Sequence, residues 1–556
     1  MTLRFKHKVY YTLLPLLALP HLTHAETNNQ HEQSLRNSER EINQQIERNR
    51  YQQLLKTSQQ TSTVTEPETD SFSQACLPVN GLQLTGIHLL DEKDLTTLTP
   101  IPENCISDAN VNRLIRELTQ RYLDRGYITA RMVFAPLDEN RTLRLHAVEG
   151  TVESIEFEQH TALSSVQNVF PSILGKPLNI RELDQGLDQL NRLPSQQISV
   201  DILPGKQFGG STLVLKNHAL AQSPFRFYTT VDNHGKKNSG RLIGRVGFSW
   251  DNLTKHADFL SLHHSQNLDH RSSRYNRSYS GLYFIPYGYW TFSAFAARSD
   301  SAVSLPVSGA KYYGSSRQFG LRLDRVLSRN QFHINTLSLS LSRKQNSNVL
   351  LGYRNPDQNL RLTVLDLSFD HLRILDNGTL SLNLGMQHGL ALFGASRSNK
   401  QRITEPQFTK FGLSASWQYP FSILDRQFQL QHRFAAQYSN DRLPSMETFD
   451  LTDNSALRGF DRLSLSSDNG WYLRNTLSYP AAYKAVSLTP FIGLDTGRIF
   501  NRNAPNAWQS AVGTSFGIHL SYRQLSGSFS FDRGWFVSSP ERQNESQFLG
   551  KITITF

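Results

Sequence analysis

Residues 337–342 read Leu-Ser-Leu-Ser-Leu-Ser, and residues 380–384 repeat the pattern as Leu-Ser-Leu-Asn-Leu. Because successive side chains of a β-strand point to opposite faces, each stretch has one apolar face and one small, polar face. At the end of the chain, every second residue from Phe548 to Phe556 gives the face Phe-Gly-Ile-Ile-Phe. Such strands are typical of a barrel whose outside meets lipid and whose inside meets water.

This strand texture extends over residues 221–556 and predicts a transmembrane β-barrel. The strands of a soluble β-sandwich would also alternate between apolar and polar residues. The length of the region and the aromatic residue at its end are what favour a transmembrane barrel over a sandwich. Strands of ~10 residues with their connections leave a count of fourteen, sixteen or eighteen open. Aromatic side chains cluster where an interfacial girdle is expected, at Tyr283, Phe284, Tyr287, Tyr289 and Trp290.

The composition excludes a helical membrane protein. Hydrophobic residues make up 38% of the 556 residues, but they never form the run of ~18 apolar residues that a spanning helix needs. Charged residues make up only 19%, below the usual ~25%. The formal net charge of +11 is compatible with a nucleic-acid or other anionic partner but does not require one.

The first quarter of the chain has the features of an exported protein. Residues 1–25 combine early basic residues, a short apolar stretch and a small-residue cleavage site, which predicts a signal peptide. Residues 26–57 are polar with a sparse apolar stripe at near-helical spacing. From the residues alone this pattern favours a disordered leader, with a solvated helix or a helix held in a polar cavity as the alternatives, and residues 58–75 resemble a linker. The two cysteines, Cys76 and Cys105, can form one disulfide in an oxidising compartment.

Two similar α+β modules are predicted, at residues 76–150 and 151–220. In the first, Ser107 or Asp108 is expected to cap a helix with an apolar face; in the second, Asn179 is expected to do so. Each helix is followed by strands. The region therefore reads as an internal repeat of a small sheet with helices on one side.

Apparent catalytic and ligand motifs have weak support. Residues 513–517 fit G-x-S-x-G, but no helix is predicted after them, as a nucleophile elbow requires. The glycine-rich residues 205–210 lack the lysine and helix of a phosphate loop. His263, His264 and His270 are interpreted as residues of a polar loop without carboxylate partners at ligand spacing. We therefore expect no catalytic residues, no metal and no cofactor.

Several strings resemble the transporters of two-partner secretion, the family that exports haemolysins, filamentous haemagglutinin and contact-dependent inhibition toxins. Residues 126–131 (GYITAR), 148–150 (VEG) and 178–194 (LNIRELDQGLDQLNRLP) are similar to its POTRA domains. Residues 457–460 (LRGF) and 493–497 (GLDTG) are similar to its barrel signatures, although Leu457 stands where Val or Ile is more frequent.

The resemblance implies a sixteen-stranded outer-membrane barrel, two periplasmic POTRA domains and an N-terminal helix that plugs the pore at rest. The most helical part of that plug is expected at about residues 37–56, and the cysteine pair would staple the start of the first POTRA domain. The predicted domains are a signal peptide at 1–25, a plug helix at 26–57, a linker at 58–75, POTRA domains at 76–150 and 151–220, and a barrel at 221–556.

The two barrel motifs are interpreted as a lock between an extracellular loop and the barrel wall. A planar guanidinium that meets a carboxylate bidentately gives direction as well as attraction. Reversing both charges of the pair is then expected to restore a function lost in Arg458→Asp. Glycines would let the loop turn and leave room on the wall. The predicted lock residues are Arg458, Gly459, Phe460, Gly493, Asp495 and Gly497.

The POTRA sheets are expected to accept an extended segment of a partner by β-augmentation, which reads backbone more than side chains. Which residues contact the partner is left open by the sequence. The predicted partner-binding residues are Arg113, Gly126, Tyr127, Arg131, Arg181, Asp184 and Leu187.

The predicted function is therefore an outer-membrane translocator. It would recognise an unfolded secreted exoprotein (a toxin, haemolysin or adhesin) and export it without ATP, as a monomer and without a nucleic-acid partner. One alternative is an insertase of the same POTRA-barrel superfamily, which normally carries more POTRA copies. A passive porin would not need the POTRA pair at all.

Overall fold

The structure of the chain is a computed structural model. It describes residues 32–36, 38, 40, 75–102, 105–135, 140–158, 163–219, 222–236, 240–269, 274–304, 311–354, 356–400, 402–461, 464–502, 507–538 and 543–556. The predicted signal peptide, most of the predicted plug and nearly all of the linker lie outside these residues. None of the described helices is long and apolar enough to cross a membrane.

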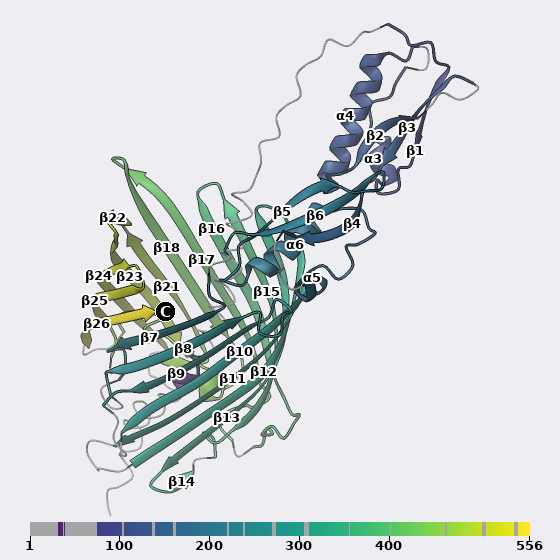
Figure 1. Ribbon diagram of the computed structural model, residues 1–556. Helices are drawn as coiled ribbons and strands as arrows, with labels where there is room; N and C mark the ends of the chain where they lie inside the picture. The colour runs from purple at the N-terminus through teal and green to yellow at the C-terminus, as the bar shows by residue number, and fades with distance from the viewer. Residues whose placement is uncertain are drawn as a thin grey trace, which may run out of the picture.

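The C-terminal region is a closed antiparallel barrel in which the last strand, β26, pairs with the first, β7 (Figure 1). The closed order also contains two segments of two and three residues, β14 (Tyr353–Arg354) and β22 (Ala481–Tyr483). Sixteen longer strands remain, which confirms the predicted fold class. They are β7 (Phe225–Asp232), β8 (Ile243–Asp251), β9 (Phe259–Asn267), β10 (Tyr275–Tyr287), β11 (Trp290–Ser304), β12 (Lys311–Arg329), β13 (His333–Leu350), β15 (Arg361–Leu375), β16 (Gly378–Leu390), β17 (Thr409–Ile423), β18 (Arg426–Tyr438), β21 (Asn469–Ser478), β23 (Val486–Phe500), β24 (Trp508–Tyr522), β25 (Leu525–Phe536) and β26 (Asn544–Thr555).

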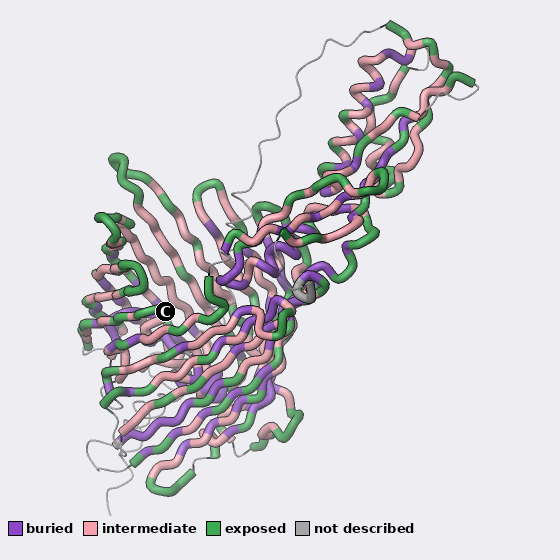
Figure 2. The backbone as a smooth tube through the Cα atoms, in the orientation of Figure 1, coloured by how far each residue is buried: buried purple, intermediate pink, exposed green. Residues whose placement is uncertain are grey.

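The alternating stretches face as the pattern indicates. Leu337 and Leu339 on β13 are 38% and 46% exposed, whereas Ser338 between them is 1% exposed. At the C-terminus, Phe548 and Phe556 are both more than 60% exposed. Figure 2 shows the same alternation of buried and exposed residues along the strands of the barrel. The barrel therefore has an apolar outer face and a polar lumen.

Two α+β modules extend from one end of the barrel as an arm (Figure 1). Each contains a three-stranded sheet in which the first and third strands are parallel neighbours, in the orders β1-β3-β2 and β4-β6-β5. The elements of the first module are β1 (Gly81–Thr85), α3 (Glu92–Thr96), α4 (Asp108–Asp124), β2 (Arg131–Ala135) and β3 (Thr142–Val148). Those of the second module are β4 (Thr151–Phe157), α5 (Leu163–Val169), α6 (Ile180–Asn191), β5 (Ile198–Pro204) and β6 (Gly210–Asn217).

The long helix of each module begins at a predicted cap. The Ser107 side chain accepts a hydrogen bond from the backbone N–H of Asn110, and the Asn179 side chain accepts one from that of Arg181. The short helices α3 and α5 were not predicted, because neither is long enough to show helical periodicity. The Cys76–Cys105 disulfide is present at the start of the first module.

The second module shares a hydrophobic core with the barrel. Leu183 and Leu190 of α6 belong to the same buried cluster as Phe259 on β9 and Phe284 on β10. The prediction that Phe284 belongs to an outer aromatic girdle is therefore wrong: its ring is 2% exposed and lies under the guanidinium of Arg192. This contact fixes the second module at the mouth of the barrel.

Candidate functional site

A long loop between β18 and β21 folds back into the barrel. It contains a 3-10 turn at Ser445–Glu447 and the short strands β19 (Phe449–Asp450) and β20 (Ser466–Ser467). Its apolar residues form a buried cluster with wall residues that include Ile499, Ala511 and Phe536. Leu457 and Phe460 of the loop are both 0% exposed. The loop is thus packed against the inner face of the wall.

The structure brings the two predicted charges of the lock together. Arg458 donates from Nε to Asp495 Oδ2 at 2.7 Å and from Nη2 to Asp495 Oδ1 at 2.5 Å. The backbone N–H of Arg458 also donates to Asp495 Oδ2, and Nη2 donates to the carbonyl oxygen of Asn475. Both side chains are at most 5% exposed. Asp495, on β23, therefore binds both the side chain and the backbone of the loop residue.

Glycines on three neighbouring strands make room for this loop segment. A Cβ atom at Gly493 on β23 would lie 2.2 Å from Cζ of Arg458, and one at Gly513 on β24 would lie 2.4 Å from the Arg458 carbonyl oxygen. One at Gly534 on β25 would lie 2.5 Å from the ring of Phe460. Gly459, with φ of +97°, lies against the backbone of Arg533. The wall is therefore shaped to the Arg-Gly-Phe segment.

Gly497 has a different neighbour from Gly493. A Cβ atom there would lie 2.4 Å from Cδ1 of Leu451 and 2.7 Å from the carbonyl oxygen of Trp471. It leaves room for the loop core rather than for the Asp495 carboxylate.

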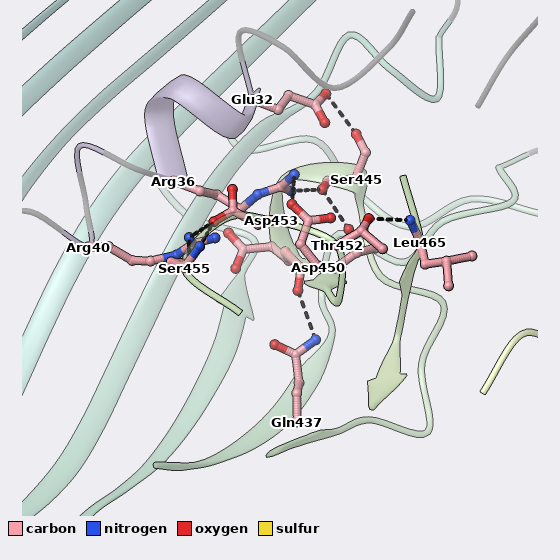
Figure 3. Close-up of polar contacts among 12 residues, drawn as sticks. Glu32, Arg36, Arg40, Gln437, Ser445, Asp450, Thr452, Asp453, Ser455 and Leu465 are labelled. Carbon is pink, nitrogen blue, oxygen red and sulfur yellow. Dashed lines mark hydrogen bonds and ion pairs between the residues drawn. The ribbon is translucent and has the colours of Figure 1, made fainter. Parts of the chain in front are cut away.

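Residues 32–36, 38 and 40, called the pore helix residues below, lie inside the barrel and are helical. They contact residues 445–455, called the loop arm below (Figure 3). Arg36 pairs with Asp450 at 2.6 Å, and Arg40 pairs with Asp453 at 2.7 Å. Glu32 accepts a hydrogen bond from the hydroxyl of Ser445. Charge complementarity thus joins these helical residues to the loop.

The barrel wall holds the same residues from the other side. Ser34 hydrogen-bonds with Asn276 on β10, and Glu32 accepts from the side-chain amide of Asn346 on β13. Two lumen cavities of about 520 and 540 Å³ remain, and Arg40 lines both. Most of the region 37–56, where the sequence placed the most helical part of the plug, lies outside the described residues. The helical residues that the structure describes here are 32–36, 38 and 40, most of them N-terminal to that region.

Comparisons with known proteins agree with this geometry. The family model described as haemolysin secretion/activation protein ShlB/FhaC/HecB matches residues 209–520, and two POTRA models match residues 77–150 and 151–204. The chain is 39% identical to the haemolysin transporter protein HpmB of Proteus mirabilis over 99% of both chains. It belongs to this family of two-partner secretion transporters.

Other relatives support the same assignment. The transporter is 40% identical to the haemolysin transporter protein ShlB of Serratia marcescens, over 94% of this chain and 93% of that one. The solved structure of CdiB from Escherichia coli is 25% identical, with a TM-score of 0.83 over 93% of this chain and 97% of that chain. The protein is an outer-membrane translocator for secreted exoproteins, with its POTRA domains in the periplasm.

Sequence reasoning missed part of the lock. Arg474, on β21 opposite Asp495, donates to the carbonyl oxygens of Asn454 and Ala456 in the loop. Gly513 belongs to the G-x-S-x-G string, and that string lies within strand β24. Its serine, Ser515, donates to Asp532 at 2.5 Å. The sequence did contain one signal for the glycine part of the lock, because Gly493, Gly513 and Gly534 occur on three consecutive strands. Only the pairing of those strands shows that the three glycines are neighbours.

Two predicted partner-binding residues instead join the two POTRA domains of the transporter. Arg181 Nη2 donates to the carbonyl oxygen of Asp124 at the end of α4. The N–H of Ile180 donates to the carbonyl oxygen of Gly126, and a Cβ atom at Gly126 would lie 2.7 Å from the Asn179 side chain. The start of α6 therefore caps the end of α4. This contact occupies Gly126 and Arg181.

The other five predicted partner-binding residues have different surroundings. Leu187 is 9% exposed in the core shared with the barrel, and Tyr127 packs against the core of the first module. Asp184 is partly buried on α6. Arg131 is exposed on the edge strand β2, and the Arg113 side chain is 39% exposed beside Glu117. Arg113 and Arg131 are thus the most accessible of the set.

The remaining ligand-like motifs have structural explanations. The glycine-rich turn 205–210 binds a carboxylate of its own chain, because Lys206 and Gln207 donate their backbone N–H groups to Glu153 Oε2. His263 and His264 lie on strand β9, so their assignment to a polar loop is wrong. His270 lies outside the described residues. Within the described part of the chain, no group of three potential metal ligands occurs.

The POTRA–barrel joint of the transporter is expected to respond to pH. Burial raises the pKa of Asp184 to about 6, and Asp188 adds to this effect while Arg329 opposes it. Arg329, on β12, pairs with Asp188 across the joint. Because the docked state holds the Asp184 proton more tightly than the undocked state, docking gains stability as pH falls through about 6 and loses it above. The gain is on the order of 1 kcal/mol.

Spin labels at the exposed positions Lys206 and Leu424 would measure this docking as a distance distribution. The distribution should be narrower at pH 5 than at pH 7.5, and Asp184→Asn should remove most of that difference. An unchanged pH dependence in Asp184→Asn would contradict the assignment to this carboxyl group.

Proposed function

We propose that this transporter binds an unfolded secreted exoprotein with its periplasmic POTRA domains and passes it through its own barrel. The main support is a closed barrel with a polar lumen, in which the loop is ion-paired to the wall and the pore helix residues are ion-paired to the loop. Cavities of about 520 and 540 Å³ lie beside these parts. A polypeptide therefore needs the helix and the loop to move before it passes.

The proposed resting state has residues 26–57 as a plug, with the pore helix residues as its anchored part. Domain limits follow the predicted ones, with a linker at 58–75, POTRA domains at 76–150 and 151–220 and the barrel at 221–556. The sequence contains no nucleotide-binding motif, and the periplasm supplies no ATP. Folding of the exported chain outside the cell removes it from the exit equilibrium, and this is the proposed driving force. We propose that a monomer in outer-membrane lipid carries out the whole process.

The free edges of the POTRA sheets are the proposed partner-binding surface. Among the described strands, β2 and β5 are edge strands, each paired with one neighbour. They carry exposed apolar residues: Phe134 on β2 is 59% exposed, and Leu203 on β5 is 49% exposed. Phe208, in the turn after β5, is 76% exposed and lies under Arg131 of β2. An extended apolar segment can pair with such an edge through backbone hydrogen bonds and cover these side chains.

The proposed cargo is a haemolysin-type exoprotein, because two relatives at 39% and 40% identity are named haemolysin transporters. A contact-dependent inhibition toxin is the second candidate, since CdiB of Dickeya dadantii is 30% identical over 84% of the chain. The open reading frame beside the transporter gene distinguishes the two. It is expected to encode a very large exoprotein with an N-terminal secretion domain.

A pair of matched substitutions tests the partner-binding surface. Phe134→Asp places a charge on the β2 edge, whereas Leu174→Asp changes a residue of equal 59% exposure between α5 and α6. Secretion of the neighbouring exoprotein should fall about tenfold or more in Phe134→Asp, because a buried unpaired charge opposes strand addition. It should change less than about twofold in Leu174→Asp. Equal secretion by the two variants would overturn the edge assignment.

A further inference from the structure

The loop arm has a second attachment to the wall, separate from Arg458. The carboxylate of Glu447 lies between two ammonium groups: Lys344 Nζ is 2.9 Å from Oε1, and Lys410 Nζ is 2.7 Å from Oε2. The Glu447 side chain is 1% exposed, and those of Lys344 and Lys410 are 5% and 12% exposed. This triad, Lys344–Glu447–Lys410, is called the acid clamp below.

The backbone of the arm is held at the same point. The carbonyl oxygen of Glu447 accepts hydrogen bonds from Lys410 Nζ and from Nε2 of Gln437, both at 3.1 Å. The three wall residues that hold Glu447 are Lys344 on β13, Lys410 on β17 and Gln437 on β18. Asp495 is on β23, a different part of the wall. The segment between Glu447 and Arg458 is therefore fixed at both ends.

The contacts to the pore helix residues lie within or next to this fixed segment. Arg36 donates to the carbonyl oxygen of Ser445 and pairs with Asp450, and Arg40 pairs with Asp453. Among the described residues, no hydrogen bond or ion pair joins the pore helix residues to Glu447 itself. The buried Glu447 carboxylate therefore does not contact the pore helix residues itself, but it is placed to set the position of the loop groups that bind them.

We propose that Glu447 is a positioning residue for the plug: the acid clamp holds Ser445, Asp450 and Asp453 where they bind Arg36 and Arg40. This inference rests on the proposed role of residues 26–57 as a plug. When the carboxylate is neutralised, the two buried lysines lose the charge that pairs with them. The arm is then held at this point only by the hydrogen bonds from Lys410 and Gln437 to the Glu447 carbonyl oxygen. The helix then loses its aligned partners and leaves the lumen more often, although none of its own residues has changed.

The test uses the full-length transporter in planar lipid bilayers. Glu447→Gln keeps the shape of the side chain and removes its charge. The fraction of time in the conducting state should rise about tenfold or more, because a buried ion pair loses one partner. Glu405→Gln, in the loop between β16 and β17, is the matched control and should change that fraction less than about twofold. Lys410→Gln attacks the clamp from the wall and should act in the same direction as Glu447→Gln.

Deletion of residues 26–57 separates positioning from simple loss of loop structure. If Glu447 acts through the helix, Glu447→Gln should have almost no effect on conductance in the deleted chain. If Glu447→Gln raises the conducting fraction equally with and without residues 26–57, the proposal is overturned. It is also overturned if neither Glu447→Gln nor Lys410→Gln changes the conducting fraction of the full-length chain. If the deletion alone leaves conductance unchanged, the proposed role of residues 26–57 as a plug is wrong. If the deletion raises conductance and the clamp variants do not, only the present inference fails.

A reversible lock gives an independent readout. Ser34 contacts Asn276 on β10 rather than the loop arm. A disulfide between S34C and N276C should hold the helix in the lumen whatever the state of the acid clamp. In the Glu447→Gln background this disulfide should return the conducting fraction to its wild-type value, and a reductant should raise it again. Continued conduction with the disulfide closed would contradict an action through the helix.

Discussion

Arg458→Met should release the loop from the wall and expose its buried residues. The substitution leaves the Asp495 carboxylate, which is 0% exposed, without the guanidinium that pairs with it bidentately. Removing one partner of a buried pair costs roughly 3–5 kcal/mol. At 1.36 kcal/mol per factor of ten, the ratio of locked to released loop should fall by about two to four orders of magnitude.

A buried cysteine in the loop reports this release directly. Ala456 is 2% exposed, and the two native cysteines form a disulfide, so Ala456→Cys provides the reactive thiol. Its labelling by a maleimide should accelerate about a hundredfold or more when Arg458→Met is added. Unchanged labelling would show that the ion pair does not hold the loop.

Gly493→Ala gives a steric version of the same experiment. The added Cβ atom would lie 2.2 Å from the Arg458 guanidinium carbon, whereas one at Gly412 on β17 would meet no atom within 4 Å. Gly493→Ala should therefore accelerate labelling of the loop cysteine, and Gly412→Ala should not. Equal behaviour of the two variants would contradict the close fit between the guanidinium and β23.

Reversing both charges of the Arg458–Asp495 pair is expected to restore little of the function lost in Arg458→Asp. Asp495 accepts from the backbone N–H of Arg458 as well as from its side chain, and Arg458 also donates to the Asn475 carbonyl oxygen. An arginine at position 495 cannot accept the hydrogen bond from the backbone N–H of residue 458. An aspartate at position 458 cannot donate a hydrogen bond to the Asn475 carbonyl oxygen. Failure of this rescue therefore no longer counts against a direct pair, contrary to the expectation from the sequence.

Deletion of residues 26–57 should give the second large effect, a rise in ion conductance. The pore helix residues share two ion pairs with the loop arm and contact β10 and β13. Removing them frees the space beside the two cavities of about 520 and 540 Å³ that Arg40 lines. The wider water-filled path should conduct several times more current in planar bilayers, by analogy with unplugged and plugged barrels of similar construction.

The double variant Arg36→Gln and Arg40→Gln is the matched control for this deletion. It keeps the length of the segment and removes the two ion pairs together with the hydrogen bonds that these arginines donate to Ser445 and Ser455. Conductance should therefore fluctuate between the wild-type level and that of the deleted chain. Equal conductance of the wild-type, double-variant and deleted proteins would contradict the plug.

The fold was predictable from local patterns where one face of an element repeats. The alternation at residues 337–342 indicates a strand with leucines outward, and Ser107 and Asn179 mark the helix starts that the structure contains. Phe284 shows the limit of such patterns. Its sequence neighbours are typical of a lipid-facing girdle, but it packs under the second POTRA domain, and only the docked arrangement of two domains reveals this.

The candidate site divides in the same way. Arg458 and Asp495 were predictable as a pair because their chemistry is specific and their strings resemble family motifs. Glu447, Lys344 and Lys410 were not, because a single charged residue in a loop and single lysines on two strands carry no local signal. The roles of Gly126 and Arg181 at the joint between the POTRA domains also depend on where α4 ends in space.

Passage of the exoprotein through the lumen is tested most directly by site-specific photo-cross-linking during export. Asn383 lines a lumen cavity, whereas its neighbour Leu384 is 47% exposed on the outer face of β16. In cells that export the neighbouring exoprotein, a photoreactive residue at position 383 should cross-link to the moving chain, and one at position 384 should not. Cross-links at 384 alone, or at neither position during active export, would contradict translocation through the barrel.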